Sequence, residues 1–116
     1  MEQRDASPDI DQTEAREPLD PGRGASLLLV DDDKAFLTRL ARAMEARGFV
    51  VTMADSVAGG LAAIQQSPPA FAVIDMRLAD GNGLDVISAL KARKPDARGI
   101  ILTGYGNIVT AVTMFP

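Results

Sequence analysis

The fold of this chain is decided by the stretch Ala70-Phe-Ala-Val-Ile-Asp75-Met-Arg-Leu-Ala-Asp80-Gly-Asn-Gly83. Its first five residues are apolar and partly β-branched, as expected of a short strand that is buried on both faces of a parallel sheet. A single carboxylate, that of Asp75, follows directly, and a segment rich in Gly, Asn and Asp then marks a loop. The stretch therefore predicts an acidic side chain at the carboxyl end of a buried strand.

Strand-like and helix-like segments alternate along the chain on both sides of this stretch. Short apolar runs are separated by segments in which apolar residues recur every three or four positions. The predicted strands are 26–30, 49–53, 70–75 and 99–103, and the predicted helices are 34–47, 57–67, 84–94 and 108–113. This alternation implies parallel strands joined by right-handed crossovers, with helices on both faces of the sheet.

Polar residues at the predicted helix starts are expected to act as caps. Asp33, Ser56 and Asn107 precede the first, second and fourth predicted helices, and each can accept a hydrogen bond from a backbone N–H of the first turn. The pair Gly59-Gly60 lies inside the second helix, where each glycine should cost about 1 kcal/mol relative to alanine. We therefore expect the start of that helix to be its weakest part.

Composition limits the chemistry that the chain can perform. Its 116 residues, 47% of them hydrophobic, suit one domain with a real core. The absence of Cys and His excludes disulfides, thiolate or imidazole zinc sites and histidine-based nucleophilic catalysis. Any chemistry must use carboxylates, hydroxyls, Lys, Arg, the backbone or a bound metal.

Charge is concentrated at the amino end. Residues 1–24 contain seven acids against three arginines, so they carry the whole net charge of −4, and residues 25–116 are balanced. We expect 1–24 to form a disordered acidic tail, and the lack of a basic face argues against direct nucleic-acid binding by this chain. Neither a membrane span of roughly 18 or more apolar residues nor a signal peptide is evident, which favours a cytoplasmic location.

Four polar side chains follow or end the predicted strands at what should be one edge of the sheet. Asp31 and Asp32 follow the first strand, Asp75 ends the third and Thr103 ends the fourth. Three close carboxylates repel one another unless a cation lies among them, and Mg²⁺ prefers such oxygen ligands. Taken singly, these residues could equally be a helix cap, a turn former and a buried hydroxyl.

Four motifs together resemble the receiver domain of two-component response regulators. They are Leu29-Val30-Asp31-Asp32-Asp33, the apolar run into Asp75, Asp80-Gly81-Asn82-Gly83 and Leu102-Thr103-Gly104. The likeness runs from about Ser26 to Thr113. Leu84-Asp85-Val86-Ile87 and Gly104-Tyr105-Gly106-Asn107-Ile108 are most similar to the RegA-type redox- and photosynthesis-responsive regulators. The resemblance implies a flavodoxin-like (CheY-like) doubly wound sheet of strand order 2-1-3-4.

The resemblance also implies a role for each site residue. Asp75 would accept a phosphoryl group from the phosphohistidine of a sensor histidine kinase. Asp32 would bind Mg²⁺ directly, Asp31 directly or through water, and the backbone carbonyl of Arg77 would complete the metal site. Thr103 would turn its hydroxyl toward the phosphoryl oxygens. Such a domain is a signalling acceptor rather than an enzyme, because it catalyses only its own phosphorylation and dephosphorylation.

Parts of the family pattern would lie beyond Pro116. These are a fifth strand with its lysine and aromatic switch residue, a fifth helix, and an output domain that regulates transcription. We therefore expect 25–113 to be an incomplete receiver and 114–116 to be terminal residues of uncertain origin. The resemblance also implies a homodimer through the fourth-helix face. Because the predicted strand at 99–103 has one open edge, we expect the chain to self-associate or to be unstable.

Three other interpretations of the sequence compete with this one. Gly104-Tyr-Gly-Asn-Ile-Val109 partly imitates a dinucleotide-binding fingerprint, but Val109 replaces its third glycine. Asp75-Met-Arg77 is similar to the nucleophile motif of haloacid-dehalogenase-type phosphatases, but Arg77 replaces their second aspartate. The third interpretation is a receiver-like module that binds partners without being phosphorylated, or a truncated remnant of a receiver.

Overall fold

A computed structural model describes residues 23–105 and 108–115 of the chain. The elements are β1 (Ser26–Val30), α1 (Lys34–Ala46), β2 (Val50–Ala54), α2 (Val57–Gln66), β3 (Phe71–Asp75), β4 (Arg77–Leu78), β5 (Gly81–Asn82), α3 (Gly83–Arg93), β6 (Arg98–Tyr105) and β7 (Ile108–Phe115). A five-stranded sheet has the order β2-β1-β3-β6-β7, and β4 pairs with β5 in a small separate ladder. Most of the expected tail, 1–22, lies outside the described residues.

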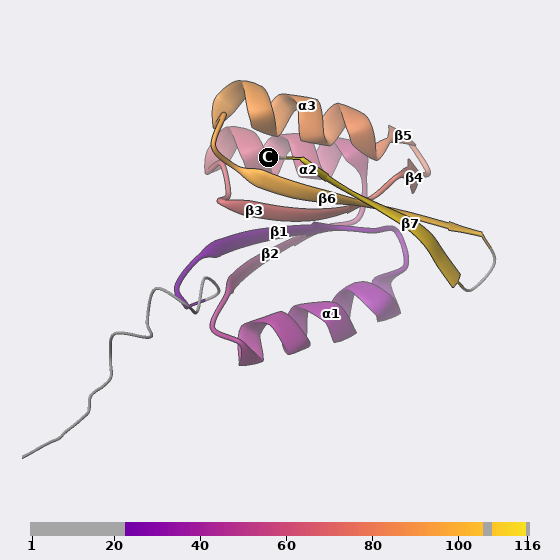
Figure 1. Ribbon diagram of the computed structural model, residues 1–116, viewed down its shortest axis with the longest axis horizontal. Coiled ribbons are helices and arrows are strands. Elements are labelled where there is room, and N and C mark those ends of the chain that lie inside the picture. The colour runs from indigo at the N-terminus through magenta and orange to yellow at the C-terminus, as the bar shows by residue number, and fades with distance from the viewer. Residues whose placement is uncertain (1–22, 106–107, 116) are drawn as a thin grey trace, which may run out of the picture.

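The sheet lies between two layers of helices. Figure 1 shows α1 on one face and α2 and α3 on the other. The first four strands in the sheet order, β2, β1, β3 and β6, are mutually parallel. The predicted doubly wound architecture and the predicted order of these four strands are therefore confirmed.

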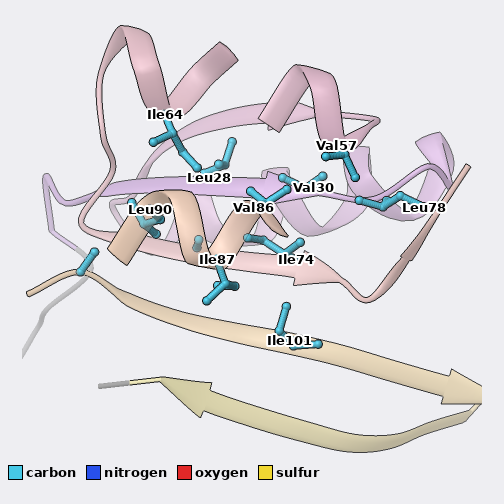
Figure 2. Packing of buried hydrophobic residues seen from close by; sticks show 12 residues of the cluster. Leu28, Val30, Val57, Ile64, Ile74, Leu78, Val86, Ile87, Leu90 and Ile101 are labelled. Carbon is cyan, nitrogen blue, oxygen red and sulfur yellow. The ribbon is translucent and has the colours of Figure 1, made fainter. Parts of the chain in front are cut away.

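Strand β1 is buried on both faces, which explains its continuous apolar sequence. Leu28 and Val30 belong to the larger cluster, which α2 and α3 cover, and Leu27 and Leu29 belong to a second cluster under α1. Figure 2 shows Leu28 and Val30 in the larger cluster, where Ile74 comes from the neighbouring strand β3. Burying each such side chain contributes about 1.5–3 kcal/mol.

Two of the predicted helix caps are confirmed. The Asp33 carboxylate accepts from the Phe36 N–H at 3.0 Å, and the Ser56 hydroxyl oxygen accepts from the Gly59 N–H at 2.9 Å. The expected weakness at Gly59-Gly60 stays a prediction, but the structure gives a packing reason for the second glycine: a Cβ atom on Gly60 would lie only 3.2 Å from a methyl carbon of Val86. The glycine therefore lets α2 approach α3 closely. The third predicted cap, Asn107, lies outside the described residues.

The predicted helix at 108–113 is wrong. Residues Ile108–Phe115 form β7, which pairs antiparallel with β6 from Tyr105↔Ile108 to Gly99↔Phe115, with an irregularity between Thr103 and Gly104. Five of these eight residues are β-branched and none is charged, a composition that favours a strand. The expected homodimer through a fourth-helix face therefore has no such helix in the part of the chain that the structure describes.

The new strand also changes the open edge of the sheet. Strand β6 extends to Tyr105, beyond the predicted end at Thr103, and β7 covers the edge that was expected to be open. The outer strand on this side is β7, and Met114 and Phe115 belong to it. Within the described residues, no helix combines the length and the apolar character that a membrane crossing requires.

Candidate functional site

Three carboxylates meet at the carboxyl edge of the sheet. Asp31 and Asp32 directly follow β1, and Asp75 is the last residue of the adjacent parallel strand β3. One carboxylate oxygen from each of the three residues lies within 4.8 Å of the others. Because the strands are parallel neighbours, the ends of two separate apolar runs deliver their acids to one point. This spacing suits a shared cation with oxygen ligands.

Burial and mutual repulsion both act on these acids. Asp31 and Asp75 are half-buried and Asp32 is exposed. Burial raises the pKa of Asp31, and the nearby charges of Asp75 and Asp32 raise it further, while a hydrogen bond from the Asp33 N–H opposes the rise. Burial likewise raises the pKa of Asp75, with a smaller contribution from Asp32. Both groups are thus destabilised in their charged form, and a cation would relieve that cost.

The segment after Asp75 is fixed by its own backbone. The Met76 N–H donates to the Leu102 carbonyl at 3.0 Å, which continues the pairing of β3 with β6 past Asp75. Arg77 and Leu78 then pair with Asn82 and Gly81 in the β4–β5 ladder. A hydrogen bond from the Arg77 backbone N–H lowers the pKa of the Asp75 carboxyl and opposes the effect of burial. Arg77 is therefore held beside Asp75 by the backbone, and its side chain is exposed.

Asp80 makes an interaction that the sequence did not reveal. Its Oδ1 accepts from the Val57 N–H at 2.8 Å and its Oδ2 from the Ala58 N–H at 3.0 Å. These two hydrogen bonds lower the pKa of Asp80. In the sequence, Asp80 belongs to a loop signal and to one motif of the family resemblance, and neither assigns it a contact with α2. The first turn of α2 has more N–H groups without an acceptor in the helix than Ser56 alone can hydrogen-bond. Nothing in the sequence identifies Asp80 as the acid that accepts from the others.

Thr103 lies at the same edge of the sheet as Asp75. The register pairs Asp75 with Leu102, so Thr103 is one residue further along the neighbouring strand. Its side chain is half-buried. The strand does not end there as predicted, because β6 continues to Tyr105 and Thr103 pairs with Ala111 of β7.

An acidic cluster at the carboxyl ends of β1 and β3 in a doubly wound sheet is the arrangement that the resemblance led us to expect. Residues 27–115 match the response regulator receiver domain, and the chain belongs to this family.

Regulators of the predicted type are among the proteins to which this chain is similar. The chain is 65% identical to the acid tolerance regulatory protein ActR of Rhizobium meliloti (strain 1021) over 91 residues, which cover 78% of this chain and 47% of that protein. It is 63% identical to the photosynthetic apparatus regulatory protein RegA of Rhodobacter capsulatus, covering 78% and 50%. The predicted similarity to RegA-type regulators is confirmed, and the chain spans about half the length of these relatives.

A solved structure shows the same fold. It is that of a response regulator protein from Burkholderia pseudomallei with a phosphorylated aspartic acid, calcium ion and citrate. The two chains are 34% identical, the match covers 72% of this chain and 49% of the other, and the TM-score is 0.66.

Proposed function

We propose that this chain is a phosphoryl acceptor in a two-component phosphorelay, with Asp75 as the accepting residue. The observation that carries the proposal is the meeting of Asp75 with Asp31 and Asp32 within 4.8 Å at one sheet edge. Family membership supports it, and the related Burkholderia protein is described with a phosphorylated aspartic acid and a calcium ion.

The acidic site is suited to Mg²⁺. Three carboxylate groups supply hard oxygen donors, and the raised pKa values of Asp31 and Asp75 show that their negative charge is poorly compensated by the protein itself. Asp31, Asp32, Asp75 and the backbone carbonyl of Arg77 would hold the ion. When bound, Mg²⁺ supplies positive charge that favours the ionised form of Asp75 and neutralises charge on the phosphoryl oxygens.

The residues of the chain then perform the transfer. A carboxylate oxygen of Asp75 attacks the phosphorus of a phosphohistidine; the new O–P bond forms as the P–N bond breaks, and its electron pair returns to the imidazole. The backbone N–H of Arg77 would orient the Asp75 carboxylate for this attack. Thr103, one residue past the strand partner of Asp75, would donate its hydroxyl to a phosphoryl oxygen.

The wider role follows from the family and the relatives. We infer that the phosphoryl donor is a sensor histidine kinase, that the protein works in the cytoplasm, and that an output domain regulates transcription, since the relatives are named as regulatory proteins. The chain would catalyse only its own phosphorylation and dephosphorylation. The alternative of a module that binds partners without phosphorylation gains no particular support from the site.

The test is direct labelling. The protein is incubated with Mg²⁺ and acetyl phosphate, and the added phosphoryl group is measured by phosphate-affinity electrophoresis and intact mass. We expect labelling of the wild type, none of Asp75→Asn, and full labelling of Asp96→Asn, a control at an exposed acid. Equal labelling of Asp75→Asn, or no labelling of a wild type that is folded by circular dichroism, would overturn the proposal.

A further inference from the structure

We propose that Asp80 is a positioning residue, which sets the affinity of the acidic site for its divalent cation by tying the β4–β5 hairpin to the amino terminus of α2. The inference rests on the proposed function. It concerns a residue outside the cluster of Asp31, Asp32 and Asp75, which acts on that cluster through the backbone.

The first link is between Asp80 and α2. Both carboxylate oxygens of Asp80 are used, on the consecutive N–H groups of Val57 and Ala58 at 2.8 and 3.0 Å. The hydroxyl oxygen of Ser56 accepts a hydrogen bond from the next N–H group, that of Gly59, at 2.9 Å. Ser56 is a local cap within its own helix, whereas Asp80 reaches α2 from more than twenty residues away. The two residues therefore cap one helix, but only Asp80 connects it to another part of the fold.

The second link is the hairpin that carries Asp80. Leu78 pairs with Gly81, so Ala79 and Asp80 form a two-residue tip, the tightest common hairpin connection. Leu78 is buried in the same apolar cluster as Val57. A Cβ atom on Gly81, which has φ +154°, would lie 3.3 Å from a methyl carbon of Val57. The hairpin thus leaves no free space between Gly81 and Val57, and Leu78 belongs to the same apolar cluster as Val57.

The third link joins the hairpin to the acidic site. Arg77, paired with Asn82, is the first residue of β4, and its N–H donates to the Asp75 carboxylate. In the proposed function its carbonyl also binds the metal. A displacement of the hairpin tip would therefore move both polar groups of the Arg77 backbone relative to Asp75. Outer groups that orient metal ligands in this way commonly change metal affinity by about 10–100-fold.

The experiment compares Asp80→Ala with two matched controls. Ser56→Ala removes the other cap of α2 and leaves the hairpin in place. Asp85→Asn removes one negative charge from an exposed site near the start of α3. Mg²⁺ affinity is measured by titration of the backbone amide resonances of Met76 and Arg77, at a temperature where circular dichroism shows every variant folded.

We expect Asp80→Ala to weaken Mg²⁺ binding about tenfold, Asp80→Asn to weaken it less because one amide oxygen can still accept, and both controls to stay within about twofold of the wild type. Ser56→Ala should nevertheless lower the melting temperature, because it loses a helix cap. Unchanged affinity in Asp80→Ala, or equal weakening in Ser56→Ala, would overturn the positioning role.

A second readout separates this inference from the proposed function. Hydrogen exchange at the amides of Arg77, Val57 and Ala58 should accelerate in Asp80→Ala and, at Arg77, remain unchanged in Ser56→Ala. If the wild type shows no response to Mg²⁺, the proposed metal site fails, and exchange alone decides whether Asp80 holds the hairpin. Wild-type exchange at Arg77 in Asp80→Ala would then refute the link.

Discussion

Gly83 lies so close to Asp75 that a Cβ atom at position 83 would overlap the backbone carbonyl oxygen of Asp75. The same Cβ would lie 2.8 Å from Cγ2 of Ile74. The Gly83 N–H donates to the Met76 carbonyl at 2.8 Å, and Gly83 is the first residue of α3. The third helix therefore begins directly against the strand end that carries the central acid of the site.

The substitution Gly83→Ala should destabilise the fold, because backbone rather than a flexible side chain blocks the added carbon. Overpacking of this kind typically costs about 1–3 kcal/mol. Urea denaturation followed by circular dichroism measures the loss. Ser88→Ala, at an exposed position of the same helix, should leave the free energy of unfolding nearly unchanged or raise it slightly. A Gly83→Ala variant as stable as Ser88→Ala would contradict the close approach.

The acidic site should oppose folding at neutral pH. Asp31 and Asp75 have raised pKa values in the folded protein, so the folded state holds their protons more tightly than the unfolded state, where the ordinary value is 3.8. Their penalty is present at pH 7 and is relieved as pH falls through the raised values. In EDTA, the double variant Asp31→Asn, Asp75→Asn should melt a few degrees above the wild type at pH 7, and this advantage should shrink toward pH 4. A lower melting temperature at pH 7 would contradict the assigned direction.

Asp80 should show the opposite pH dependence. Hydrogen bonds from the Val57 and Ala58 N–H groups lower its pKa, so its contribution to stability is present above the ordinary value of 3.8 and is lost as pH falls through the lower folded value. Asp80→Asn should therefore melt below the wild type at pH 7, and the two should converge in acid below pH 3.8. Thermal melts across this range, recorded in EDTA, provide the measurement. A constant difference at every pH would show that the carboxylate charge is not what stabilises the contact.

Two leucines of α3 provide a matched pair for the core. Leu90 is 0% exposed in the larger cluster, and Leu84 is 38% exposed. Leu90→Ala should lower the free energy of unfolding by about 2–5 kcal/mol, because it removes a buried side chain and leaves a cavity. Leu84→Ala should cost well under half as much. Similar losses at both positions, measured by urea denaturation, would argue against the orientation of α3.

The outer edge of β7 should cause self-association. In the part of the chain that the structure describes, β7 pairs only with β6, and its eight residues include no charge and no proline that would block a further strand. Sedimentation velocity at increasing protein concentration should show oligomers. Thr113→Lys should reduce them, since edge lysines disfavour strand pairing, whereas Ser88→Lys, the same charge change on α3, should not. Monomeric wild type at high concentration would refute this expectation.

Most of the fold could be predicted from local patterns. Strands such as Ser26–Val30 are continuous apolar runs because they are covered on both faces, and the helices between them have one apolar stripe. The caps at Asp33 and Ser56 followed from side-chain chemistry alone. The meeting of the three acids followed from the rule that parallel strands present their carboxyl ends to one edge.

The failures have a different physical origin. At Ile108–Phe115 the apolar spacing was compatible with a short helix, and the β-branched content favoured a strand; antiparallel pairing with β6 decided the outcome. At Asp80 the contact with α2 depends on the meeting of segments that are distant in the sequence. Long-range pairing of this kind leaves no periodic signal in the residues themselves.

The sheet also separates two apolar clusters, and no buried residue belongs to both. Leu28 and Val30 serve the cluster under α2 and α3, and Leu27 and Leu29 serve the one under α1. Substitutions in the two halves should thus combine additively. Substitutions can then accumulate in the cluster on one face without compensating substitutions in the other cluster. The acids at the edge of the sheet keep their identity. Such independence would let related chains diverge in their partners and still keep the same chemistry.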